Sequence, residues 1–233
     1  MGDNIKQTQS GNHNIQIGSV ENMAVGSTVY VHVPSHPRIK ILFLSSNPLS
    51  DRPLQLDEEA RLIMQKIRAS DFRDNIELVT AWAVRPDDLL QLLNEHKPQI
   101  VHFSGHGMGS GKLVLTGSDG SPKTVSVSAI ASLLGLFKQH IRIILLNACF
   151  SNIQAKAVQR VIDCTIGMRQ SIGDEAARIF AASFYRAIGF GSSVQDAFEQ
   201  GKVAVQLEGI PEEKTPELTC KPGVDPAAII LVS

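Results

Sequence analysis

Hydrophobic and polar positions follow two alternating patterns from about residue 38 to the end of the chain. Short continuous apolar runs predict strands that are buried on both faces of a sheet. Between these runs, apolar residues recur at helical spacing, as at Leu56, Ala60, Ile63 and Ile67, which predicts amphipathic helices. The expected strands lie at residues 39–45, 76–84, 99–105, 111–117, 141–148 and 161–167. The expected helices lie at 56–69, 85–96 and 126–140, from about 152, and at about 173–188 and 193–206.

The alternation of strands and helices predicts an α/β fold with a mostly parallel sheet flanked by helices on both faces. We assign residues 38–233 to this domain. In such sheets, functional groups gather where the strands end, at their carboxyl edge. The residues directly after each strand are therefore the first candidates for chemistry.

Residues 1–33 follow a different pattern. They are rich in Asn, Gln, Gly, Ser and Val, and three short similar units recur among them. This composition predicts a short β-prone segment, which a linker at 34–37 joins to the domain. The segment either pairs between chains, for assembly or recruitment, or forms a small local β-structure or plain disorder. The letters NIQIG at 14–18 resemble the core of the RIP homotypic interaction motif, which implies self-assembly or binding of an activating partner.

The composition is that of an ordinary globular protein, and its 43% of hydrophobic residues suffices for a sizeable core. The formal net charge is −1 and no long basic run is present, which argues against nucleic acid or an anionic membrane as a partner. No apolar run is long enough to span a bilayer, and the first residues lack the pattern of a secretory signal. We therefore expect a cytoplasmic protein.

The chain has three cysteines, Cys149, Cys164 and Cys220, and no CxxC pair. An odd number without such pairs argues against a disulfide framework and against a structural zinc site. In a reducing cytoplasm we expect the thiols to be free. Cys164 lies inside an apolar strand, where it is expected to be inert.

Two strand ends carry residues that can act together. The strand at 99–105 runs into His106 and Gly107, and the strand at 141–148 runs into Cys149. Because one predicted helix separates them, the two strands are expected to be parallel neighbours whose ends meet at the same edge. A thiol attacks a carbonyl as a thiolate, and a nearby imidazole can take its proton and later protonate the leaving amine. The arrangement predicts Cys149 as nucleophile and His106 as its base.

Gly107 adds a second element of this chemistry. The tetrahedral oxyanion needs backbone N–H donors, and a glycine lets the chain approach closely because it has no Cβ. The N–H groups of Gly107 and Cys149 are the expected donors. This chemistry requires no metal and no organic cofactor.

The letters VHFSGHG at 101–107 and LLNACFS at 145–151 resemble the CHAT group of caspase-like (clan CD) cysteine peptidases, which includes relatives of separase. The resemblance extends over about residues 39–210 and implies a caspase-like fold with His106 and Cys149 as the dyad. It also implies an endopeptidase with protein substrates. Activation by a partner or by clustering through residues 1–33, in bacterial defence or regulated cell death, is the expected setting.

The sequence departs from the caspase signature Q-A-C-[RQG]-G, because NACFS surrounds Cys149. The reason to expect cleavage after aspartate is thereby removed. Many CHAT relatives prefer a basic residue before the scissile bond, and Asp174 is the acidic candidate to bind it.

Other interpretations of these residues stay open. A cysteine that ends a core strand is often only packed there, and His102 is expected to be a core histidine. Glu59 and its two acidic neighbours begin a helix, where negative charge suits the helix dipole, so they are not expected to form a metal site. The alternative function is a catalytically silent caspase-like adaptor that self-assembles through its amino-terminal segment. An NAD-hydrolysing domain is disfavoured, because SSNPLSDRP follows the first strand in place of a glycine-rich phosphate-binding loop.

Overall fold

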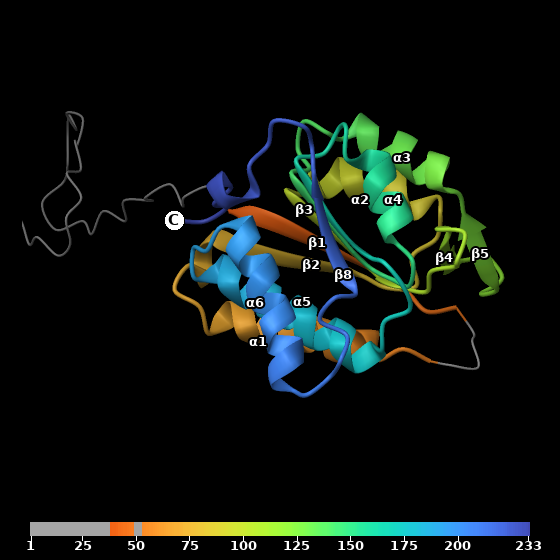
Figure 1. The fold of residues 1–233 in the computed structure, drawn as a ribbon. Helices are drawn as coiled ribbons and strands as arrows, with labels where there is room; N and C mark the ends of the chain where they lie inside the picture. Colours follow the sequence, from red (N-terminus) through yellow and green to blue (C-terminus); the bar gives the residue numbers. More distant parts are fainter. Residues whose placement is uncertain (1–37, 49–52) are drawn as a thin grey trace, which may run out of the picture. The chain divides into compact units, whose positions relative to one another are not determined.

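The computed structural model describes residues 38–48 and 53–233, and its centre is a six-stranded sheet in the order β2-β1-β3-β6-β7-β8 (Figure 1). Neighbouring strands run parallel from β2 to β7, and β8 pairs antiparallel with β7. The strands are β1 Ile39–Ser46, β2 Ile76–Ala81, β3 Ile100–Gly105, β6 Ile143–Asn147, β7 Cys164–Met168 and β8 Pro216–Cys220. The expected mostly parallel sheet is confirmed.

Helices cover both faces of the sheet, as Figure 1 shows. One face packs against α1 (Leu56–Arg68), α5 (Asp174–Gly189) and α6 (Val194–Leu207). The other packs against α2 (Asp88–His96), α3 (Val127–Leu136) and α4 (Asn152–Val158). Two short 3₁₀ turns lie at Arg73–Asn75 and Pro226–Ala228.

The two hydrophobic cores follow from the alternation of side chains along buried strands. In β1, Ile41 and Phe43 face the α1 and α5 side, and Leu42 and Leu44 face the α2 and α3 side. All four side chains are at most 3% exposed, which explains why the sequence of β1 is a continuous apolar run.

A second, two-stranded sheet follows β3 in the chain. Its strands β4 (Leu113–Thr116) and β5 (Pro122–Val125) pair antiparallel. The sequence predicts only the first of them, because β5 is mostly exposed and has no apolar run. The sequence pattern does not predict the edge strand β8 either, because four of its five residues are only partly buried.

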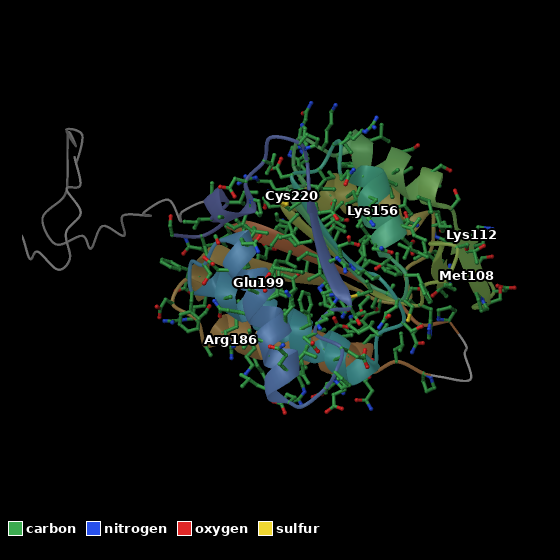
Figure 2. The ribbon with its side chains drawn as sticks, viewed as in Figure 1. Met108, Lys112, Lys156, Arg186, Glu199 and Cys220 are labelled. Atoms are coloured by element: carbon green, nitrogen blue, oxygen red, sulfur yellow. A yellow bond between two sulfur atoms is a disulfide. The ribbon has the colours of Figure 1, made fainter. Side chains whose placement is uncertain are left out.

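The expectation that all three thiols are free is wrong for one pair. Cys164 in β7 and Cys220 in β8 form a disulfide with their Cα atoms 4.1 Å apart. Figure 2 labels Cys220. The two cysteines face each other directly across the antiparallel pairing, and this is the geometry in which two Cβ atoms approach closely. Counting cysteines could not show this, because the pairing depends on the unpredicted strand β8.

The predicted β-prone segment at 1–33 and the linker at 34–37 lie outside the described residues and stay predictions. Within 38–48 and 53–233, none of the helices has the length and apolarity needed to cross a lipid bilayer.

Candidate active site

The register between β3 and β6 brings His106 and Cys149 to the same edge of the sheet. Ser104 lies opposite Asn147, the final pair between these two strands. His106 follows Ser104 by two residues, and Cys149 follows Asn147 by the same interval. Because the strands are parallel, both side chains emerge where the strands end. The expectation that these strands are parallel neighbours is confirmed.

Gly107 lies directly against the backbone of Cys149. A Cβ built on Gly107 would lie 2.0 Å from the carbonyl oxygen of Cys149 and 3.1 Å from its amide nitrogen. Only glycine fits at this distance, so the close approach expected from the sequence is present. Gly107 also pairs with Leu113, and the amide of Val114 donates to the His106 carbonyl at 3.0 Å. These contacts anchor the segment after β3 on the small β4–β5 sheet.

The imidazole of His106 is bound by a residue that the sequence analysis missed. Its Nε2 lies 3.1 Å from Oδ1 of Asn47, directly after β1. The Asn47 amide orientation follows from its other contact, because Nδ2 donates to the Leu54 carbonyl at 3.2 Å. An acceptor therefore faces Nε2, which makes Nε2 the protonated nitrogen and leaves Nδ1 able to take a proton. The signal for Asn47 was its place after the neighbouring strand, in the letters SSNP.

Burial also tunes this imidazole. His106 is partly buried, and this burial lowers the pKa of its side chain below the ordinary value. The neutral form, which a general base needs, is therefore favoured at neutral pH.

Cys149 is the free thiol among the three cysteines, all of which lie in the described residues. It is partly exposed, and its Sγ makes one long contact of 4.0 Å with the Ile172 carbonyl. The next residue, Phe150, has a φ of 57°, which is unusual for a bulky side chain. Its amide donates to the Gln170 carbonyl at 3.2 Å, so the sharp turn into α4 is held from the end of β7. Such a turn presents the thiol at the sheet edge.

Met108 and Lys112, labelled in Figure 2, lie in the short loop between β3 and β4. The Met108 side chain is 43% exposed, and its amide donates to the Lys112 carbonyl at 3.0 Å. The segment after Gly107 thus forms a bonded rim beside His106.

Asp174 lies at the first position of α5, and its carboxylate already has a partner within the chain. Arg178, one turn later, pairs with it and also donates to Gln55 at 2.9 Å. The prediction that Asp174 binds a basic substrate residue stays a prediction, and the structure gives that residue an internal competitor.

Two polar residues near the site, His102 and Glu59, are buried in the core. His102 is fully buried, as expected of a core histidine. Glu59 lies in the first turn of α1 with its two acidic neighbours, as expected, but it is only 2% exposed, which the sequence pattern did not indicate. Its carboxylate points into the core toward β3 and β6, because α1 turns this residue to the same face as Ala60 and Ile63. In the described residues, no three metal-ligating side chains converge.

Comparisons with known proteins define the fold and the family of this chain. The crystal structure of the Arg specific cysteine proteinase gingipain R matches the fold with a TM-score of 0.58 at 12% identity, covering 82% of this chain and 47% of that chain. The fold is therefore caspase-like. More narrowly, the chain belongs to the CHAT domain family, whose model matches residues 33–215.

Two curated relatives are similar to this chain over part of their length. A Roc-COR-CHAT protease from an unknown prokaryotic organism is 25% identical over 181 residues, which are 75% of this chain and 17% of the relative. A probable protease from Gillisia limnaea (strain DSM 15749 / LMG 21470 / R-8282) is 25% identical over 150 residues, which are 64% of this chain and 26% of the relative. The chain thus spans at most about a quarter of the length of these relatives.

Proposed function

We propose that this chain is a cysteine endopeptidase in which Cys149 is the nucleophile and His106 the general base. One observation carries the proposal: the last β3–β6 pair, Ser104 with Asn147, lies two residues before His106 and Cys149, so that both follow at one sheet edge. Gly107 is packed on the Cys149 backbone. A protease-named relative and a peptidase fold neighbour support the class of reaction.

The reaction begins when Nδ1 of His106 takes the thiol proton and Sγ of Cys149 attacks the peptide carbonyl carbon. The carbonyl π electrons move to oxygen, and the N–H groups of Gly107 and Cys149 bind this oxyanion. Collapse of the tetrahedral intermediate breaks the C–N bond, and the imidazolium gives its proton to the leaving amine. Asn47 holds Nε2–H throughout, so that Nδ1 remains the nitrogen that exchanges protons.

The remaining thioester is removed by water. The neutral imidazole takes a proton from the water as its oxygen attacks the thioester carbon. The second intermediate expels the thiolate of Cys149, which recovers the proton from the imidazolium. The two cleaved segments leave as a carboxylic acid and an amine.

The setting of this activity is also part of the proposal. The substrates are proteins cut after a basic residue, with Asp174 as its partner once Arg178 moves aside. Activation comes from a partner or from clustering through residues 1–33, in the cytoplasm of a bacterium that uses the enzyme for defence or regulated death.

A peptide-library digest tests the proposal, with wild type beside Cys149→Ala and His106→Ala, free in solution and under enforced clustering. We expect cleavage by wild type only, and labelling of Cys149 by a peptidyl electrophile. Absence of turnover and of labelling under both conditions would favour the silent adaptor instead.

A further inference from the structure

A buried polar cluster lies directly beneath the candidate dyad. Its members come from four elements of the fold and are each at most 4% exposed. They are Glu59 of α1, His102 and Ser104 of β3, Asn147 of β6, and Tyr185 of α5. A buried charge is costly unless several donors satisfy it, so this cluster needs a physical explanation.

The cluster is organised around the carboxylate of Glu59. Asn147 donates Nδ2–H to Oε1 at 2.6 Å, and the hydroxyl of Ser104 donates to Oε2. His102 Nε2 lies 3.1 Å from Oε1, within ion-pair distance although not aligned as a hydrogen bond. Convergent donors are the partners that an ionised carboxylate, which only accepts, requires.

The outer members fix the orientation of the inner ones. Tyr185 lies 3.2 Å from Nδ1 of His102 and is fully buried. Burial, and secondly the charge of Glu59, raises the pKa of the Tyr185 hydroxyl well above its ordinary value, so the hydroxyl keeps its proton. The contact with Tyr185 holds the His102 ring with Nε2 facing the carboxylate of Glu59. Asn147 also donates to the Ala177 carbonyl at 3.2 Å, which prevents its amide from turning over.

Glu59 thereby joins the two strand ends that carry the dyad. Ser104 and Asn147 are the last residues paired between β3 and β6, and each lies two residues before a dyad member. One carboxylate holds one bond to each of them. Because charge-assisted bonds are short and directional, this bridge resists sliding and spreading of the strand ends.

We infer that Glu59 is a positioning residue, which sets the relative placement of His106 and Cys149 by bridging Ser104 and Asn147. The inference rests on the proposed function, since it concerns the same dyad. Glu59 acts through the strands and contacts no reacting atom.

The test compares Glu59→Gln with Ile63→Ala in the full chain. Gln keeps the size of Glu59 but presents an amide N–H₂ to groups that are themselves donors. Ile63 lies one turn later on the same face of α1, is fully buried, and forms no part of the polar cluster. It therefore controls for general loosening of the α1 packing.

Three quantities are measured for each variant: the thermal midpoint, kcat with KM, and the rate of Cys149 alkylation by iodoacetamide against pH. For Glu59→Gln we expect kcat and alkylation near neutral pH to fall on the order of 10- to 100-fold, because small misplacement of reacting groups has such effects. KM should change little, and the alkylation profile should approach that of His106→Ala. Ile63→Ala should lose thermal stability while keeping the wild-type profile.

The inference is overturned if Glu59→Gln keeps the wild-type kcat and the wild-type alkylation profile. It is also overturned if Ile63→Ala, at the same thermal midpoint as Glu59→Gln, loses as much kcat and as much alkylation rate. Should Glu59→Gln not fold, Ser104→Ala replaces it, since it removes one donor with little change in volume. A wild-type alkylation profile in Ser104→Ala would then overturn the inference. Lack of peptide turnover by wild type counts against the proposed peptidase, whereas alkylation still measures the placement of Cys149 beside His106.

Discussion

Asn47 and His106 are joined by a 3.1 Å contact between Oδ1 and Nε2, which links the carboxyl ends of β1 and β3. The residues are 59 positions apart in the chain, and the parallel pairing of β1 with β3 makes them neighbours. Because Nδ2 of Asn47 is bound to the Leu54 carbonyl, the amide cannot turn over without losing that bond. The imidazole of His106 is thus oriented by the residue that follows β1, which lies on the opposite side of β3 from β6.

Replacing Asn47 with Ala should lower kcat about tenfold and leave KM nearly unchanged, because the ring loses the contact that fixes its orientation. Steady-state kinetics on a cleaved peptide measure both constants. Asn94→Ala is the matched control, since its exposed side chain bonds only Leu90 within α2 among the described contacts. Equal kcat values for the two variants would rule out a role of Asn47.

Gly107→Ala should abolish turnover and lower the free energy of unfolding by about 1–3 kcal/mol, the usual cost of overpacking. The added Cβ would lie 2.0 Å from the Cys149 carbonyl oxygen, so the backbone must move. Gly109→Ala, in the same loop, has no atom within 4 Å of its added Cβ. Peptidase assays and urea unfolding should therefore separate the two alanine variants; a fully active Gly107→Ala is the contrary result.

The acid limb of kcat/KM should have its midpoint below about pH 6.5, the ordinary value for histidine. Burial lowers the pKa of His106, and the base must be neutral to take the thiol proton. Activity is therefore retained as the pH falls to about 6.5 and is lost as it falls through the lowered pKa. A rate profile between about pH 5 and 8 measures this, with buffer-matched stability controls. An acid midpoint above about 6.5 would contradict the effect of burial.

Loss of the Cys164–Cys220 disulfide should lower the free energy of unfolding by about 2–4 kcal/mol, because the bond closes a long loop in the unfolded chain. The two cysteines are 56 residues apart. Denaturant unfolding with and without reductant measures the difference in wild type. The double variant Cys164→Ala/Cys220→Ala should not respond to reductant. Identical wild-type curves under both conditions would contradict a structural disulfide.

Much of the fold was predictable because β1, β3, β6 and β7 are buried on both faces and carry continuous apolar runs. Strands with a solvent-exposed face escaped this criterion, as β5 and β8 show. The ends of β2 and α3 were placed too far along the chain. Apolar letters continue past Ala81, and the apolar Phe137 follows Leu136, where the regular structure stops. Apolar character reports burial, and it does not report where hydrogen-bonded pairing ends.

By itself, the sequence determined the alternating strands and helices, and with them the sheet edge at which His106, Gly107 and Cys149 emerge. Those features are local, since each is encoded in a run of neighbouring residues. Only the tertiary structure decided that Asn47 meets His106, that Glu59 bridges Ser104 and Asn147, and that Cys164 pairs with Cys220. These contacts depend on strand order, register and helix rotation, which arise from packing between distant segments and leave no periodic trace in the chain.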